Sequence, residues 1–219
     1  MIKAIIFDMD GLLIDTESIW TLADHNFLAR YGKTYRPLDK SHFMGSGVRE
    51  FIKVIKKKFA LHESEEKLLS ERMEIFQSLI KDDLELMPGA EDLLSELSKN
   101  GYLLAMATGN TRRMMDLITE DLRVRKYFNV TVSSDEVPHG KPAPDIFLEA
   151  ARRLKVTPKE CLVLEDAING VISAKAAGMK AIAVCDQRYN KPESFTEADL
   201  VVGSLREISV EIIKQLIQV

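Results

Sequence analysis

The sequence predicts an α/β protein, in which a parallel β-sheet carries helices on both faces and a helical block interrupts the chain. From Pro88 onward, short apolar runs alternate with segments of helical spacing, as in folds built on a parallel sheet. One further apolar run, at residues 3–7, precedes a stretch of helical patterns without a convincing strand. We therefore expect an α/β core made of residues 1–14 and 85–219, with a helical cap of residues 15–84 inserted into it.

Three amphipathic segments predict the helices of the cap. The first covers residues 18–31 and stops at Gly32, and the second covers residues 48–59. The third starts at Ser64, a good N-cap residue with two glutamates after it, and continues through Ile80. Three such helices in a row are typical of a small helical bundle.

The other patterns predict the elements of the core. Apolar runs bounded by turn residues predict buried strands at residues 3–7, 103–107, 129–132, 161–164, 180–184 and 200–202. Helical spacing predicts helices at residues 90–99, 112–123, 145–154, 169–177 and 210–217. Because strands and helices alternate, we expect a parallel sheet that is covered on both faces.

Composition and charge argue against several classes of function. The 219 residues include 30 Lys and Arg against 34 Asp and Glu, and this net charge of -4 gives no footprint for nucleic acid. No apolar stretch approaches the length of a membrane span, and the first apolar run is too short for a signal peptide. Cys161 and Cys185 lie in apolar runs, which is typical of reduced core thiols. We expect a monomer in the cytoplasm.

Polar residues follow four of the predicted strands. They are Asp8 with Asp10, the turn Thr108-Gly109-Asn110, Lys141, and Glu165 with Asp166. Since ligands bind beyond the carboxyl ends of the strands in an open parallel sheet, these groups can meet at one place. Carboxylates bind Mg²⁺, while an ammonium and backbone N–H groups bind phosphate oxygens. Each cluster alone also fits a solvated acidic turn, a strand-to-helix turn or a surface lysine. Four clusters at equivalent positions indicate a site for a metal and a phosphoryl group.

Four motifs, in this order, resemble those of the haloacid dehalogenase-like hydrolase superfamily. They are DMDGLLIDT at residues 8–16, Thr108, GKPAPD at residues 140–145 and EDAING at residues 165–170. The resemblance covers the chain from end to end. It is strongest to the subgroup of β-phosphoglucomutase, phosphoglycolate phosphatase, and sugar-phosphate and pseudouridine-phosphate phosphatases. It implies a Rossmann-like core with the first strand central, and a helical cap that opens and closes over the site.

The resemblance also implies a mechanism for hydrolysing a phosphate ester. Asp8 would be the nucleophile that forms an aspartyl-phosphate. Asp10 would protonate the leaving oxygen as a general acid and then activate water as a base. Lys141 would neutralise the charge of Asp8 and of the phosphate, so that an anionic nucleophile can approach an anionic substrate.

The same resemblance names a cofactor and the groups that bind it. Mg²⁺ would be held by the carboxylates of Asp8 and Asp166 and by the backbone carbonyl of Asp10, with Glu165 as a further ligand or support. The phosphoryl oxygens would be bound by Thr108, Lys141 and the backbone N–H groups near Gly109 and Asn110.

The cap is expected to choose the substrate, a small phosphorylated metabolite such as a sugar phosphate or a nucleotide-like ester. Gly45 lies in a glycine-rich turn where relatives carry a specificity loop. Arg49 follows it and would contact a substrate hydroxyl or anionic group, unless it is a solvated residue of the first helical turn. Residues 14–16 and 82–84 are the expected hinges between core and cap.

Trp20 bears on the choice between two reactions. β-Phosphoglucomutase carries a His near the start of its first cap helix, and this chain has Trp20 there. The difference favours a phosphatase over a mutase, with Trp20 either lining the pocket or packing the cap. A relative that binds phosphate without catalysis is a third alternative, against which the complete set of nucleophile, acid, lysine and metal ligands argues.

Overall fold

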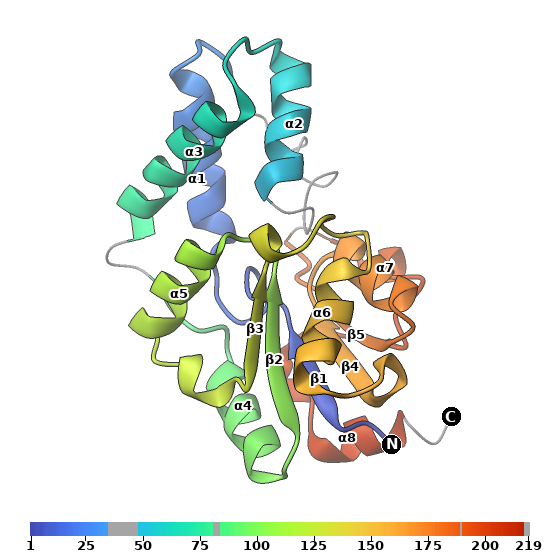
Figure 1. Ribbon diagram of the computed structural model, residues 1–219. Coiled ribbons are helices and arrows are strands. Elements are labelled where there is room, and N and C mark those ends of the chain that lie inside the picture. The colour runs from blue at the N-terminus through green and yellow to red at the C-terminus, as the bar shows by residue number, and fades with distance from the viewer. Residues whose placement is uncertain (35–47, 81–83, 189, 217–219) are drawn as a thin grey trace.

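The computed structural model describes residues 1–34, 48–80, 84–188 and 190–216 of the chain. Within these residues, the core is a six-stranded parallel sheet in the order β3–β2–β1–β4–β5–β6 (Figure 1). The strands are β1 Ala4–Phe7, β2 Leu103–Thr108, β3 Val130–Ser133, β4 Cys161–Glu165, β5 Lys180–Val184 and β6 Leu200–Val202. The expected α/β class is confirmed.

The first strand of the chain lies in the middle of the sheet and is buried along its length. Ile6 of β1 pairs with Ala105 of β2 on one side and with Val163 of β4 on the other. The chain adds β2 and β3 outward on one side and then returns to add β4, β5 and β6 on the other. Ligands of such sheets bind where the strand order reverses. In this chain that place lies just after Phe7.

Helices cover both faces of the sheet, as the alternating pattern predicts. Ile5 and Ile6 of β1 point to opposite faces and belong to two different apolar clusters. The cluster of Ile5 includes residues of α4 (Ala90–Lys99), α5 (Arg112–Asp121) and α8 (Val210–Gln215). The cluster of Ile6 includes residues of α6 (Asp145–Leu154) and α7 (Ile168–Ala176). The strands are therefore shielded from water, and polar groups gather only at their ends.

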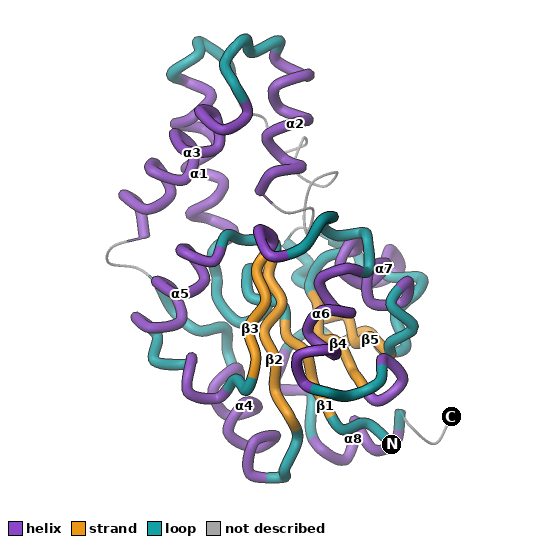
Figure 2. Tube along the Cα trace, viewed as in Figure 1, coloured by secondary structure: helices purple, strands orange, loops and turns teal. Residues whose placement is uncertain are grey.

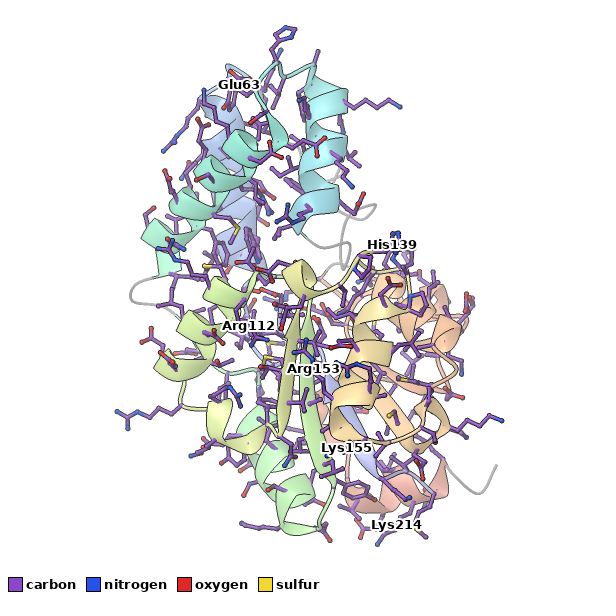
Figure 3. All side chains as sticks on the ribbon, in the orientation of Figure 1. Glu63, Arg112, His139, Arg153, Lys155 and Lys214 are labelled. Atoms are coloured by element: carbon purple, nitrogen blue, oxygen red, sulfur yellow. The ribbon has the colours of Figure 1, made fainter. Side chains whose placement is uncertain are left out.

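Two arginines protect the edge strand β3. Arg112 of α5 and Arg153 of α6 each donate a hydrogen bond to the carbonyl of Thr131, at 3.1 and 3.0 Å (Figure 3). Both also pair with Glu136, which follows the strand. An open edge can pair with a strand of another chain, so these contacts block such pairing at β3.

The three helices α1 (Glu17–Ala29), α2 (Val48–Phe59) and α3 (Glu65–Leu79) pack together beyond the carboxyl ends of β2 and β3 (Figures 1 and 2). A buried ion pair joins two of them, in which Arg72 of α3 donates to Asp24 of α1 at 2.6 Å. The guanidinium lies between the rings of Trp20 on α1 and Phe51 on α2, 4.1 and 4.0 Å from their centroids. One buried cluster therefore connects all three helices.

Some expectations lie outside the described residues. Gly45 and residues 82–83 of the second expected hinge belong to this group, as does Ile217 at the end of the last predicted helix. The domain boundaries at residues 14/15 and 84/85 stay a prediction. No helix in the described part of the chain is long and apolar enough to cross a membrane. Cys161 and Cys185 are free and buried.

One predicted strand is displaced by a single residue. The pattern predicts residues 129–132, whereas β3 spans Val130–Ser133. Asn129 instead uses its side chain, whose oxygen accepts a hydrogen bond from the N–H of Leu104 at 2.8 Å. Its own N–H donates to the carbonyl of Leu104 at the same distance. Asn129 therefore contacts the start of β2 without belonging to the regular strand.

Candidate active site

The polar residues predicted from four separate segments meet at the carboxyl ends of the central strands. Asp8 directly follows β1, Thr108 ends β2 and Glu165 ends β4. Lys141 comes from the loop between β3 and α6, and its ammonium reaches this place through the interior. The parallel sheet thus joins groups that lie more than 150 residues apart in the sequence.

Lys141 bridges the two carboxylates that end β1 and β4. Its side chain is 1% exposed, and Nζ donates to Oδ1 of Asp8 and to Oε1 of Glu165, both at 2.5 Å. A third hydrogen bond, of 3.2 Å, goes to the carbonyl of Ala107 on β2. Burial alone would lower the pKa of Lys141, but the two carboxylates outweigh it, so the pKa is raised and the ammonium stays charged.

Asp8 lies in an excess of negative charge. Burial raises the pKa of Asp8 to about 8, and the ammonium of Lys141 only partly offsets this. The neighbouring carboxylates of Glu165 and Asp10 raise it further. A cation near Asp8 would remove this imbalance. The site is therefore electrostatically prepared for a positively charged cofactor.

Three carboxylates are arranged so that one cation could contact all of them. Asp8, Glu165 and Asp166 each offer one carboxylate oxygen. These three oxygens lie within 4.8 Å of one another, and all three side chains are buried. Oxygen-only donors with a net negative charge suit a hard cation such as Mg²⁺. The carboxylate of Asp10 is not part of this group, and the role of its backbone carbonyl as a ligand stays a prediction.

Two glycines make room for these carboxylates. A Cβ on Gly11 would lie 2.2 Å from Oδ2 of Asp166, and Gly11 also has a φ of +78°, which other residues rarely adopt. A Cβ on Gly170 of α7 would lie 1.8 Å from Oε1 of Glu165. The glycines in the motifs at 8–16 and 165–170 are thus needed because the acidic side chains pass directly over them.

Asp10 does not share a hydrogen bond with Lys141, and from the described residues its carboxylate accepts five hydrogen bonds from four side chains. Oδ1 accepts from Thr16 at 2.8 Å, from the indole N–H of Trp20 at 3.1 Å and from the side-chain amide of Asn110 at 3.2 Å. Oδ2 accepts from Thr108 at 3.1 Å and again from Asn110 at 3.0 Å. Residues of the core and of the cap therefore both hold this carboxylate in place.

The turn after β2 is occupied by contacts within the protein. The Thr108 hydroxyl donates to Asp10 and accepts from the backbone N–H of Asn110 at 3.0 Å. The Gly109 carbonyl accepts from the N–H of Val48, the first residue of α2, at 3.2 Å. The binding of phosphoryl oxygens by Thr108, Gly109 and Asn110 stays a prediction. These contacts do bring the turn to the junction of core and cap.

The cap residues named from the sequence have different surroundings. Trp20 is 7% exposed and stacks on Phe76 with centroids 3.6 Å apart, so it packs the cap, and its N–H also reaches Asp10. Arg49 is exposed on the first turn of α2. Sequence reasoning missed the Asn110 side chain and Thr16 as partners of Asp10. Thr16 is the last residue of the first motif, and this position could have indicated a role at the site. Asn110 was expected to contribute only its backbone N–H.

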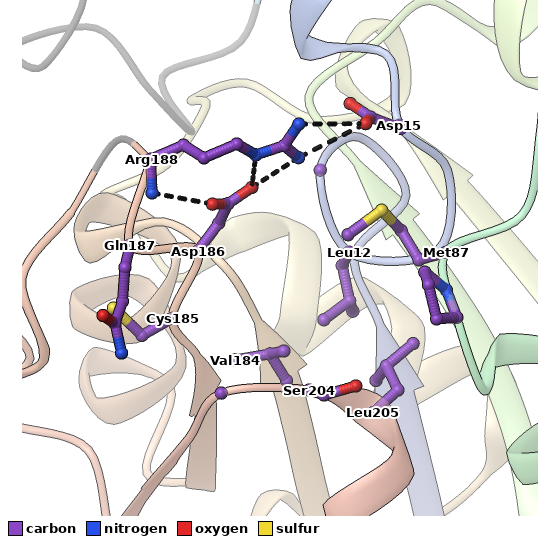
Figure 4. Close-up of a pocket in the computed structure, with 13 residues that line it drawn as sticks. Leu12, Asp15, Met87, Val184, Cys185, Asp186, Gln187, Arg188, Ser204 and Leu205 are labelled. Carbon is purple, nitrogen blue, oxygen red and sulfur yellow. Dashed lines mark hydrogen bonds and ion pairs between the residues drawn. The ribbon is translucent and has the colours of Figure 1, made fainter.

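A separate pocket of about 470 Å³ lies beside the first crossing between core and cap. Arg188, which follows β5, donates to Asp186 at 2.8 Å and to Asp15 at 3.3 Å across its rim (Figure 4). Gly11 and Leu12 also line it, but Asp8, Lys141 and Asp166 do not. The ion pair with Asp15 ties the crossing to the core.

The chain is similar to known proteins in sequence and in fold. The family model described as haloacid dehalogenase-like hydrolase matches residues 5–184. A probable pseudouridine-5'-phosphatase of Drosophila melanogaster is 40% identical over 212 residues, covering 94% of this chain and 91% of that protein. A phosphorylated carbohydrates phosphatase of Thermotoga maritima is 31% identical over 219 residues, covering 98% and 100%.

A solved structure extends the agreement to the fold. CbbY from Rhodobacter sphaeroides in complex with phosphate superposes with a TM-score of 0.82 at 29% identity, covering 94% of this chain and 96% of that one. The match includes both the sheet and the segment of the three cap helices, and the family model spans the motifs of Asp8, Thr108, Lys141 and Asp166. The chain therefore belongs to the haloacid dehalogenase-like hydrolases.

Proposed function

We propose that this enzyme is a Mg²⁺-dependent phosphatase that hydrolyses a small phosphate monoester through an aspartyl-phosphate on Asp8. The observation that supports this most directly is the buried Lys141, which touches Asp8 and Glu165 at 2.5 Å next to Asp166. A lone binding site for phosphate would not need a buried carboxylate at its centre, because a carboxylate repels phosphate. A nucleophile does need to be there, and the lysine lowers that repulsion.

The metal ligands in this proposal are the carboxylates of Asp8 and Asp166 and the backbone carbonyl of Asp10, with Glu165 as ligand or support. When bound, Mg²⁺ supplies positive charge between the carboxylates and the phosphoryl group. An oxygen of Asp8 attacks phosphorus. The ammonium of Lys141 stabilises the negative charge as it passes from Asp8 to the phosphoryl oxygens. Thr108 and the N–H groups of the turn after β2 bind those oxygens.

Asp10 performs the proton transfers. It gives a proton to the leaving oxygen and then takes one from the water that hydrolyses the aspartyl-phosphate. Thr16 lies at the crossing and Trp20 on the first cap helix, and both donate to Asp10. We include in the proposal that residues 15–84 move as a cap domain, because such a movement would change the surroundings of the acid as the site closes.

The substrate in this proposal is a small phosphorylated metabolite, a sugar phosphate or a nucleotide-like ester. Two relatives named above support this, since one is named for pseudouridine 5'-phosphate and the other for phosphorylated carbohydrates. Arg49 and Gly45 of the cap would contact the organic part of the ester. The proposal places the enzyme in the cytoplasm as a monomer, and its two free, buried cysteines are typical of a reducing compartment.

Hydrolysis is preferred to a mutase reaction because of Trp20. An indole cannot exchange a proton at neutral pH, whereas the His of β-phosphoglucomutase can. A mutase must also protect the aspartyl-phosphate from water until a second sugar hydroxyl arrives. The indole N–H of Trp20 already donates to Asp10 and its ring stacks on Phe76, so Trp20 offers no acceptor for such a hydroxyl.

The first experiment measures release of phosphate from p-nitrophenyl phosphate with Mg²⁺, using Asp8→Asn as the inactive control. The second supplies β-glucose 1-phosphate with catalytic glucose 1,6-bisphosphate and follows both products. We expect free phosphate to form faster than glucose 6-phosphate. The opposite order would establish a mutase, and turnover by Asp8→Asn equal to that of the wild type would remove Asp8 as the nucleophile.

A further inference from the structure

Among the described residues, only Asn110 contacts both carboxylate oxygens of Asp10. Its amide nitrogen donates to both carboxylate oxygens, at 3.2 and 3.0 Å, whereas Thr16, Trp20 and Thr108 each reach one oxygen. Asn110 is 2% exposed, so it has little freedom to turn elsewhere. A donor that contacts both oxygens fixes the rotation of the carboxylate group as well as its position.

The oxygen at the other end of the same amide has no partner among the residues that the structure describes. Oδ1 of Asn110 is buried, and no donor among the described residues reaches it. The amide cannot be reversed to satisfy this oxygen, because it would then face the carboxylate oxygens of Asp10. A buried acceptor without a donor destabilises a protein by about 1–3 kcal/mol. Such an atom beside the acid of the reaction points to a donor that arrives with the substrate.

The chemistry of the ester limits what this donor can be. A phosphate monoester dianion has no hydrogen to donate, and its bridging oxygen has none before the acid protonates it. A donor that arrives with the substrate therefore belongs to its organic part, close to the bridging oxygen that Asp10 protonates. A hydroxyl group on the next carbon atom fits this requirement, as in phosphates of sugars and polyols.

We propose that Asn110 positions Asp10 for proton transfer and selects alkyl phosphates that carry a hydroxyl group on the carbon next to the ester carbon. The inference rests on the proposed phosphatase function and deepens it. Asn110 holds the acid with its amide nitrogen and receives the substrate hydroxyl with its amide oxygen. One side chain thereby couples recognition of the leaving group to its protonation.

The test uses three phosphates that separate the two roles. p-Nitrophenyl phosphate has a good leaving group and depends little on the acid. n-Propyl phosphate has a poor leaving group and no second hydroxyl, and sn-glycerol 3-phosphate adds that hydroxyl. The quantity compared is kcat/KM with Mg²⁺, because it reports the transfer to Asp8, in which the acid acts, and excludes the hydrolysis step that all three share.

The variants are Asn110→Leu and Asn110→Ala, with Asn100→Leu as the matched control. Asn100 is exposed and lies just before β2, at the end of that strand opposite to Asn110. We expect Asn110→Leu to lower kcat/KM for n-propyl phosphate by roughly 10- to 100-fold, the equivalent of a hydrogen bond to a charged group. The loss for p-nitrophenyl phosphate should stay within about threefold. The preference of the wild type for sn-glycerol 3-phosphate over n-propyl phosphate should disappear.

Three results would contradict the proposal in different ways. An equal loss on all three phosphates, in Asn110→Leu and in the smaller Asn110→Ala, would show a structural role only. A preference for sn-glycerol 3-phosphate that survives in both variants would exclude the amide oxygen as the hydroxyl acceptor. A wild-type enzyme that hydrolyses none of the three would overturn the proposed function itself, which the wild-type measurements reveal without any variant.

Discussion

Asp8→Asn tests the electrostatics of the site through stability as well as activity. Burial raises the pKa of Asp8 to about 8 in the folded protein, against 3.8 for an unperturbed group. Because the folded value is the higher one, the stability that this group contributes is present below pH 3.8 and is lost as the pH rises to about 8. At about 1.4 kcal/mol for each pH unit, this loss reaches at most roughly 6 kcal/mol at pH 8.

The substitution removes this loss at almost constant side-chain volume. It also gives up the ion pair of Asp8 with Lys141, but Lys141 keeps Glu165 as a partner at 2.5 Å. We therefore expect a net gain of about 1–3 kcal/mol for the metal-free protein at pH 8. For a chain of this size, the gain raises the midpoint of thermal unfolding by roughly 2–10 °C.

The assay is thermal unfolding in excess chelator at several pH values between 4 and 8, together with turnover of p-nitrophenyl phosphate in Mg²⁺. The wild type should lose stability as the pH rises through this range, and Asp8→Asn should lose much less. The variant should have no measurable turnover. A variant that is less stable than the wild type at pH 8, or that keeps the full pH slope, would refute the argument that uncompensated charge at Asp8 destabilises the metal-free fold.

Three further predictions concern the metal, the packing around Glu165 and the cap. Mg²⁺ should raise the midpoint of thermal unfolding and support turnover. Ca²⁺ should inhibit turnover, because its longer bonds and larger number of ligands would draw both oxygens of Asp8 onto the metal. Full activity in excess chelator would contradict this prediction. Gly170→Ala should lower the free energy of unfolding by about 2–4 kcal/mol and abolish most turnover, because its Cβ would lie 1.8 Å from Oε1 of Glu165 and displace it from Lys141. Gly140→Ala, whose Cβ meets no atom within 4 Å, is the control, and equal behaviour of the two variants in denaturant titration would disprove the reasoning. Trp20→Phe keeps an aromatic ring for stacking but loses the N–H that reaches Asp10 at 3.1 Å. We expect kcat/KM for n-propyl phosphate to fall several-fold and the free energy of unfolding to change by about 1 kcal/mol or less. An equal fall for p-nitrophenyl phosphate would show that Trp20 is only a packing residue.

The fold class and the groups that gather at the site follow from the amino-acid pattern alone. Apolar runs such as residues 161–164 predict buried strands, and their alternation with helical spacing predicts a parallel sheet. In a parallel sheet all carboxyl ends lie at one edge, so the polar residues after β1, β2 and β4 had to approach one another. Local pattern was sufficient here because burial and strand direction are properties that each segment carries alone.

The contacts that each side chain makes at that edge depend on how the folded elements pack. The sequence has Asp8 and Asp10 two residues apart and cannot tell that one pairs with Lys141 while the other turns to Thr16, Trp20 and Asn110. It also could not tell that Trp20 both packs the cap and reaches the core. These choices depend on side-chain directions and on partners up to 133 residues away, which are set only when the sheet, its loops and the cap helices have packed together.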